Sequence, residues 1–400
     1  MALSQVANGD TGLQARTKIN AGLTAVDGLT AAVDIPGLNL LNFKAGQFQN
    51  ARRGLASVQT AQGRAIFAII GDSTSTGSGA GTGTSQVTDA NVLKPSRWLA
   101  DMITGKAGMQ TNVEMFLGDG GVTTGAGSTI TAYDPRIVLG TGWSFSGTGL
   151  YANGTTTDAV TFTPATPVDT FEITMANTGS VLGFTIGGAA PTTGGSSITL
   201  PSTTVVSKTI ITGASASLAP LAISRVSGTA RFIGVRAWNS TVAPKLDVIT
   251  YSIHGTTAGI MVNSTGGIQY GDIWKSIGAS LYFFNVMLND IPGTSIASYK
   301  TSISTACDLA RAAGGDIVLV VPPAKNGVTD AVFQTYIAAV KEVALAKDCT
   351  VLDLYTRFGG VYSAASGTRW YYNNGSDGTH GTRFMYADVG RAYADLVSAL

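Results

Sequence analysis

Charged side chains are scarce in this chain of 400 residues. Asp, Glu, Lys and Arg together make up 12% of it, about half the usual share. The net charge is only +1, and no cluster of Lys and Arg supplies the basic surface that binding to a phosphate backbone requires. We therefore expect no nucleic-acid partner.

Cysteine is also rare, and neither a long apolar run nor the pattern of a leader sequence is found. Cys307 and Cys349 are the two cysteines; their spacing matches no metal site, so we expect two buried free thiols. No apolar run approaches the length of a membrane span, so no membrane partner is expected. The N-terminus lacks a basic region followed by a hydrophobic segment, which predicts that there is no Sec signal peptide. A protein of this kind that acts outside a cell would leave by lysis, by a holin-like route or on a particle.

Apolar residues and glycine are plentiful instead, at 44% of the chain and 51 residues. This composition favours a folded protein with many short strands and tight turns. The pattern along the chain divides it into an N-terminal arm over 1–55, an α/β domain over 56–107 plus 246–400, and an inserted β domain over 108–245.

The α/β domain is predicted from apolar runs that alternate with helical stretches. Such runs are typical of strands buried on both faces, so the sheet should be parallel with crossover helices. The expected strands are 64–70, 247–253, 281–287, 316–321 and 350–354, and the main expected helices are 95–103, 296–313 and 330–347.

The inserted segment alternates apolar and polar residues, which predicts an antiparallel β-sandwich. Turn signals separate its runs, and Asn153–Gly154 is expected to form a hairpin turn. Its aromatic residues could stack on sugar rings, although most such residues are core residues in proteins; they are Trp143, Phe145, Tyr151 and Trp238.

Histidine is restricted to His254 and His380. An acid–base mechanism near neutral pH would use one of them. His380 follows Asp377 by three residues, a spacing that lets the carboxylate orient the imidazole. The alternative is a surface Asp–His pair.

Other candidates follow the predicted strands directly. Ser73 follows the strand 64–70, Gly255 follows 247–253, and Asn289 follows 281–287. In an open parallel sheet, ligands bind at the carboxyl ends of the strands. Each signal alone is explained equally well by a simple turn, but together they point to one edge of one sheet.

These blocks resemble the SGNH (GDSL-like) hydrolase family, in the order that the family has. The resemblance lies in Gly71–Asp72–Ser73, Ser252–Thr257, Asn289–Asp290 and Asp377–His380. It implies a flavodoxin-like three-layer α/β/α fold. Two departures stand out: Met287 replaces the glycine of the third block, and Gly121 is an alternative to Gly255 as the oxyanion glycine.

The resemblance also implies roles for these residues in a serine esterase that needs neither metal nor organic cofactor. Ser73 is the nucleophile, His380 the base, and Asp377 the residue that orients His380. Ser73, Gly255 and Asn289 form the oxyanion hole. Asp72, His254 and Asp290 are candidates for substrate contacts, and a structural role for His254 is an equal alternative.

The inserted domain resembles jelly-roll carbohydrate-binding modules, and the arm resembles phage tail proteins through Gly9–Gly12 and Arg16–Asn20. Together they imply an O-acetyl esterase acting on bacterial surface polysaccharide, extracellular or carried on a virion with other tail proteins. A homotrimer would suit a tail fibre, but no heptads indicate one. Two alternatives are a lipase or thioesterase and a non-catalytic receptor-binding tail protein.

Overall fold

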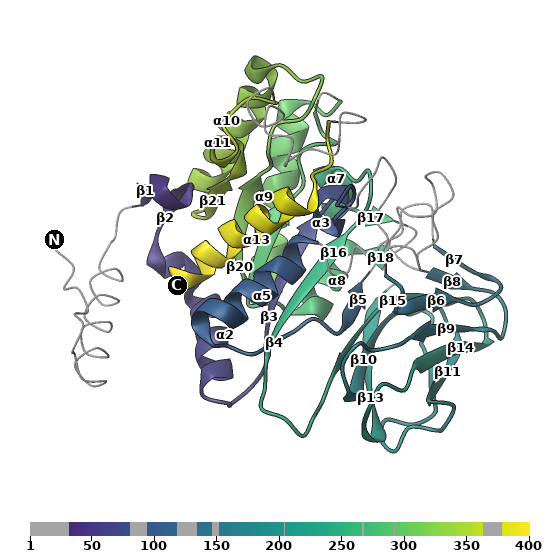
Figure 1. Cartoon of the computed structure of the whole chain (residues 1–400). Helices are drawn as coiled ribbons and strands as arrows, with labels where there is room; N and C mark the ends of the chain where they lie inside the picture. Colours follow the sequence, from purple (N-terminus) through teal and green to yellow (C-terminus); the bar gives the residue numbers. More distant parts are fainter. Residues whose placement is uncertain are drawn as a thin grey trace, which may run out of the picture.

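The structure is a computed structural model, and it describes residues 32–80, 94–117, 134–145, 152–203, 205–265, 268–291, 293–362 and 378–400. Residues 1–31, with the phage-like part of the arm, lie outside this range. The described chain forms a large mixed sheet flanked by helices, with two smaller antiparallel sheets beside it (Figure 1).

The large sheet has eight strands in the order β1-β2-β21-β20-β19-β3-β16-β4. All neighbouring strands from β21 to β4 run parallel, while β1 and β2 are antiparallel. The strands are β1 (Val33–Ile35), β2 (Leu40–Phe43), β3 (Ala65–Gly71), β4 (Thr111–Asn112), β16 (Leu246–Ser252), β19 (Leu281–Asn285), β20 (Asp316–Val321) and β21 (Thr350–Asp353). The expected parallel sheet is confirmed.

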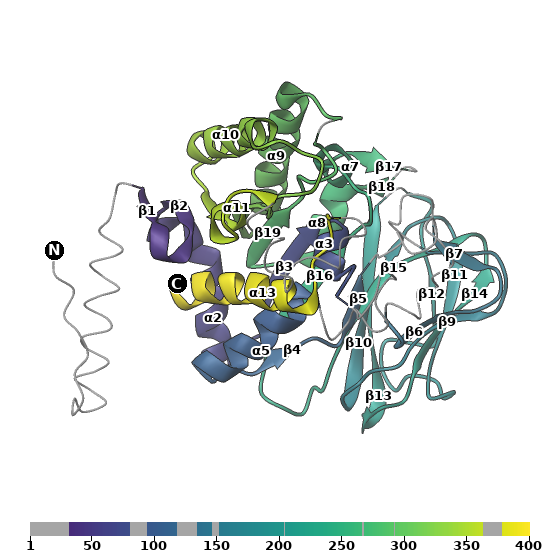
Figure 2. The same ribbon diagram turned by 45° about the horizontal axis from the view of Figure 1, so that its top comes forward.

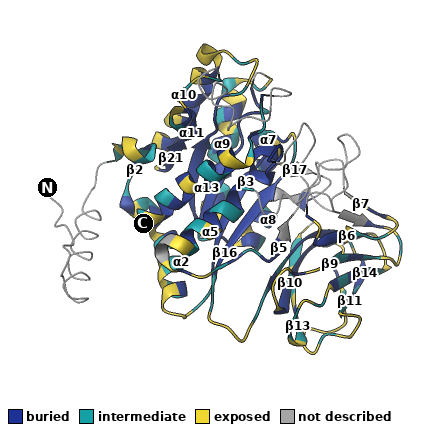
Figure 3. Cartoon of the chain, viewed as in Figure 1, coloured by how far each residue is buried: buried dark blue, intermediate teal, exposed yellow. Residues whose placement is uncertain are grey.

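Helices cover both faces of this sheet, because its strands carry apolar side chains on alternate sides. Phe67 and Phe283 pack against α2 (Gln49–Gln59), α5 (Pro95–Ala107) and α13 (Arg383–Ser398). Ala68 and Phe284 face the opposite way, toward α8 (Tyr270–Ile277), α9 (Ile296–Ala312) and α10 (Asp330–Ala346). Figures 2 and 3 show the resulting layers and the buried strands between them.

The antiparallel strands form two sheets that share one apolar core. One contains β13 (Val206–Ser217), β10 (Val168–Ala176), β15 (Ala230–Trp238), β8 (Ala152–Gly154) and β7 (Trp143–Phe145), with β5 (Met115–Leu117) paired to β15. The other contains β12 (Ser197–Thr199), β11 (Val181–Ile186), β14 (Leu221–Ser227), β9 (Ala159–Phe162) and β6 (Ile137–Leu139).

One sequence expectation needs correction here. The hairpin turn at Asn153–Gly154 is wrong: both residues lie in β8, where a Cβ on Gly154 would lie 2.5 Å from the Trp143 ring. Glycine is needed there for close packing rather than for a turn.

Buried charges join the two sheet systems. Asp247 on β16 is fully buried and receives Arg64 at 2.5 Å and Arg236 at 2.7 Å, while Arg236 also pairs with Glu172. Both guanidinium groups lie over the Trp238 ring, 5.2 and 5.1 Å from its centroid. Trp238 therefore supports the junction between the sheets instead of offering a face for sugar.

Trp143 is likewise a core residue, 6% exposed, and its indole donates to the Asp158 carbonyl at 2.6 Å. The Phe145 side chain and Tyr151 lie outside the described residues. The two tryptophans thus have structural contacts, in line with the expectation that most of these aromatic residues are core residues.

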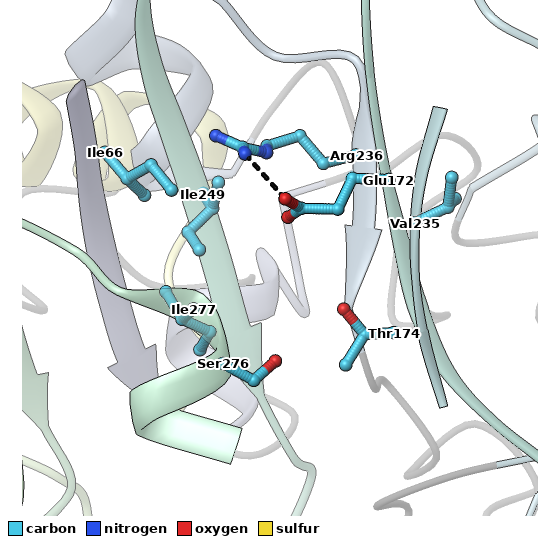
Figure 4. A pocket seen from close by; sticks show the side chains of 8 residues that line it. All are labelled: Ile66, Glu172, Thr174, Val235, Arg236, Ile249, Ser276 and Ile277. Atoms are coloured by element: carbon cyan, nitrogen blue, oxygen red, sulfur yellow. Dashed lines mark hydrogen bonds and ion pairs between the residues drawn. The ribbon is translucent and has the colours of Figure 1, made fainter. Parts of the chain in front are cut away.

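A small cavity lies at the same junction (Figure 4). It holds about 20 Å³ of free space between β3, β16 and α8 on one side and β10 and β15 on the other, which is room for about one water molecule. Ile66 and Ile249 line it; Ile66 is the second residue of β3 and Ile249 the middle residue of β16. The cavity is therefore remote from the carboxyl ends that the candidate site occupies.

Candidate active site

The carboxyl ends of three central strands meet in register. Gly71 at the end of β3 pairs with Ser252 of β16 on one side and with Asn285 of β19 on the other. Residues that directly follow these strands must therefore lie near one another. Ser73, the turn containing Gly255, and Asn289 all emerge from this edge of the sheet.

Ser73 opens a short helix, α3 (Ser73–Thr76). Asp72 caps this helix: its Oδ1 accepts from the Thr74 backbone N–H at 2.9 Å and from the Thr74 hydroxyl at 2.7 Å. A Cβ on Gly71 would lie only 2.0 Å from the Ser75 hydroxyl oxygen. The tight turn therefore requires glycine before the Asp–Ser pair, which explains the local sequence physically.

His380 approaches Ser73 from the loop that precedes α13. Its Nε2 lies 2.7 Å from the Ser73 hydroxyl oxygen, and Ser73 is 7% exposed. This distance suits direct proton transfer between a nucleophile and a base. Asp377 lies outside the described residues, so its contact with His380 stays a prediction.

Asp72 lies close to both histidines but directs its carboxylate toward the helix. Burial raises the pKa of Asp72 above its ordinary value, opposed by the hydrogen bonds from Thr74 and by the charges of His380 and His254. Its role in the described geometry is to cap α3, since its carboxylate accepts both the N–H and the hydroxyl of Thr74.

The loop after β16 turns sharply at Gly255. Thr256 donates its N–H to the Ile253 carbonyl at 3.3 Å, and Gly255 has a φ of +66°. Glycine adopts this left-handed conformation without strain. No atom lies within 4 Å of the position that a Cβ on Gly255 would take, so its backbone faces open space. Gly121, the alternative, lies outside the described residues.

Asn289 is tied to this turn, because its Nδ2 donates to the Thr256 carbonyl at 3.0 Å. The next residue, Asp290, is fully buried and accepts the Ala258 N–H at 2.9 Å. Burial raises the pKa of Asp290, while the bond from Ala258 opposes the rise. Asp290 thus bonds the first residue of the short helix α7 (Ala258–Val262), and a contact between Asp290 and substrate stays a prediction.

Met287, which stands where the resembled family has glycine, is fully buried in the apolar core. The substitution therefore fills the interior behind Asn289. Within the described part of the chain, no group of three or more His, Cys, Asp and Glu residues could hold a metal ion. No helix among the described residues is long and apolar enough to span a membrane.

Solved structures of other proteins resemble much of this chain. A peptidoglycan O-acetylesterase superposes with a TM-score of 0.61 at 12% identity, over 88% of this chain and 96% of that one. A family two carbohydrate esterase from Clostridium thermocellum, in complex with cellohexaose, reaches a TM-score of 0.31 at 12% identity over 66% and 98% of the two chains. No family profile and no curated protein sequence matches the chain. At this identity the first likeness shows a shared fold with an esterase.

Four residues of the site region were not expected from sequence. Ser78 lies 2.5 Å from His254, Gly79 packs against His380, and Tyr386 donates its hydroxyl to the Ser78 carbonyl at 2.5 Å. Asn285 donates to the Ser75 hydroxyl at 3.1 Å. Ser78 and Gly79 belong to a Gly- and Ser-rich stretch that looks like an ordinary loop, so only Asn285, at a strand end, carried a usable signal.

Proposed function

We propose that this chain is a serine esterase that removes O-acetyl groups from bacterial surface polysaccharide. The observation that carries the proposal is the 2.7 Å distance between the Ser73 hydroxyl and His380 Nε2 at the carboxyl edge of the parallel sheet. A hydroxyl beside an imidazole is the minimal arrangement for acyl transfer through a covalent intermediate.

In the proposed reaction, Ser73 Oγ attacks the acetyl carbonyl while His380 Nε2 takes its proton. The tetrahedral intermediate collapses, the sugar hydroxyl leaves with the proton from His380, and an acetyl-Ser73 remains. Water then attacks with His380 again as base, which releases acetate and restores the hydroxyl. Asp377 would hold the imidazole and stabilise its protonated form.

The oxyanion of both tetrahedral intermediates would be held by the N–H groups of Ser73 and Gly255 and by Asn289 Nδ2. Asn289 is already bonded to the Gly255 turn through the Thr256 carbonyl at 3.0 Å, and its second N–H remains for the oxyanion. A donor of this kind stabilises the transition state by about 3 kcal/mol.

A carbohydrate substrate is supported by the low charge of the chain, 12% of its residues, and by the fold that it shares with a peptidoglycan O-acetylesterase. A neutral, hydroxyl-rich surface suits a neutral glycan better than an acidic polymer. An extracellular or virion-borne site of action, with other tail proteins as partners, belongs to the same proposal.

The test is acetate release from purified, O-acetylated bacterial polysaccharide, with p-nitrophenyl acetate and a long-chain ester alongside. Wild type should release acetate and prefer the short ester, and Ser73→Ala should reduce kcat by at least about 10⁴-fold. Ser96→Ala is the matched control, because Ser96 is a buried serine that bonds Thr250 at 2.5 Å and takes no part in the site.

Other outcomes reject the proposal in distinct ways. Preference for the long-chain ester would favour a lipase or thioesterase. A folded wild type without esterase activity that binds the polysaccharide would favour a receptor-binding protein. Equal activity of wild type and Ser73→Ala would exclude Ser73 as the nucleophile.

A further inference from the structure

A second serine–histidine pair lies beside the first. His254 Nε2 is 2.5 Å from the Ser78 hydroxyl oxygen and 3.4 Å from that of Thr76. Ser78 is 3% exposed, and its backbone N–H and carbonyl are both bonded to other parts of the site. The pair therefore needs an explanation other than a second nucleophile.

Ser78 connects three parts of the site through three different atoms. Its N–H donates to the Ser73 carbonyl at 3.1 Å, and its hydroxyl contacts His254, which directly precedes Gly255. Its carbonyl accepts the Tyr386 hydroxyl at 2.5 Å. Ser78 is thus bonded to Ser73, to the residue before the Gly255 turn, and to α13.

Tyr386 extends this connection to the base. Its hydroxyl oxygen also accepts the N–H of Gly381, the residue after His380, at 3.2 Å, and the ring is 1% exposed. The loop that carries His380 is therefore held to the Ser78 carbonyl through a single buried phenol.

The turn containing Gly255 is also held by Asn289, which donates to the Thr256 carbonyl at 3.0 Å. His254 and Asn289 hold the two ends of the segment 254–256, with Gly255 between them. The position of the Gly255 N–H relative to Ser73 is set by the contact between His254 and Ser78.

We propose that Ser78 and His254 are positioning residues, which align the Gly255 N–H and the His380 loop with Ser73. This inference rests on the proposed esterase function. His254 Nε2 can accept from the Ser78 hydroxyl when neutral or donate to it when protonated, because the hydroxyl can rotate toward Thr76, 3.2 Å away. The alignment does not need His254 as a base.

The experiment compares kcat, KM and pH profiles for Ser78→Ala, His254→Ala and His254→Gln, with Ser96→Ala as control. Gln places an amide where the imidazole has Nε2. Ser78→Ala and His254→Ala should lower kcat about 10- to 100-fold with KM within about threefold, because small misplacements of reacting groups slow the reaction strongly. His254→Gln should recover most of the loss, and the acidic limb of the kcat/KM profile should stay at its wild-type pH.

Three results would overturn the inference. Wild-type kcat in both alanine variants would show that the pair does not align the site. A shifted acidic limb in His254→Gln, with activity as low as in His254→Ala, would make His254 a base. If Ser78→Ala and His254→Ala lower kcat no more than Ser96→Ala does, the pair contributes only to stability.

A measurement without turnover separates this inference from the esterase proposal. A double-mutant cycle of Ser78→Ala and His254→Ala on the urea midpoint should be non-additive if the pair exists in solution. If wild type is inactive but the cycle is non-additive, the esterase function is rejected while the Ser78–His254 contact stands. If wild type is active but the cycle is additive, the contact is rejected while the esterase function stands.

Discussion

The imidazole of His380 and the hydroxyl of Ser73 lie 2.7 Å apart although 307 positions separate them in the chain. Gly79 packs against the base of the His380 side chain: a Cβ on Gly79 would lie 2.8 Å from the His380 Cβ and 3.0 Å from the Gly381 carbonyl oxygen. The geometry of the pair therefore depends on a glycine that has no chemistry of its own.

Gly79→Ala should lower kcat by about 100-fold, because the added methyl displaces His380 from Ser73. Gly314→Ala is the matched control: both glycines have a φ of +84°, but nothing lies within 4 Å of a Cβ on Gly314. In both variants, alanine in the left-handed conformation should lower the free energy of unfolding by about 1 kcal/mol. Esterase kinetics and urea unfolding of the two proteins check this, and similar kcat values for both would contradict it.

Asn289→Ala should reduce kcat by about 100- to 1,000-fold, since an oxyanion donor is lost. KM for a small acetyl ester should change little, because the interaction strengthens only as the oxyanion forms. Steady-state kinetics with p-nitrophenyl acetate measures both constants. A rise in KM at unchanged kcat would instead place the Asn289 amide in ground-state binding.

Asp290→Asn should change how stability depends on pH. Burial raises the pKa of Asp290 above its ordinary 3.8, so the folded chain holds this proton more tightly than the unfolded chain. The free energy of unfolding that this bound proton contributes is present at low pH and is lost as pH rises through the raised pKa. The variant should therefore gain stability relative to wild type between about pH 4 and neutrality. Urea unfolding across this range measures the difference. If the stability of wild type and variant depends on pH in the same way, the pKa of Asp290 is not raised.

The two cysteines should not react with a thiol reagent in the native state. They are 0% and 1% exposed, with sulfur atoms 3.8 Å apart, and only the exposed thiolate is reactive. Titration with Ellman's reagent should find no fast-reacting thiol in the folded protein and both thiols after unfolding in guanidinium. If no thiol reacts after unfolding, the two sulfurs are joined in a disulfide in the isolated protein.

Periodicity predicted most of the fold. The apolar runs at 64–70 and 316–321 became β3 and β20, and the helix expected from Pro95 begins there. Such strands can be predicted from sequence, because a strand buried on both faces needs apolar residues throughout. The free, buried state of Cys307 and Cys349 is confirmed as well.

Local signals failed where a distant partner decides the conformation. Asn153–Gly154 has the composition of a turn, but the Trp143 ring requires the glycine inside a strand. That partner is not visible in the few residues around the motif.

The sequence by itself determined the elements and the chemically competent residues. A strand end followed by Gly–Asp–Ser, and a second strand end followed by Asn–Asp, are local patterns that elementary stereochemistry can interpret. The pairing of His380 with Ser73 is expected from the resemblance and agrees with the 2.7 Å distance, whereas only the tertiary structure placed His254 beside Ser78. The reason is physical: these pairings depend on how loops from β3, β16 and α13 meet above one edge of the sheet, and the packing of the whole domain sets that meeting.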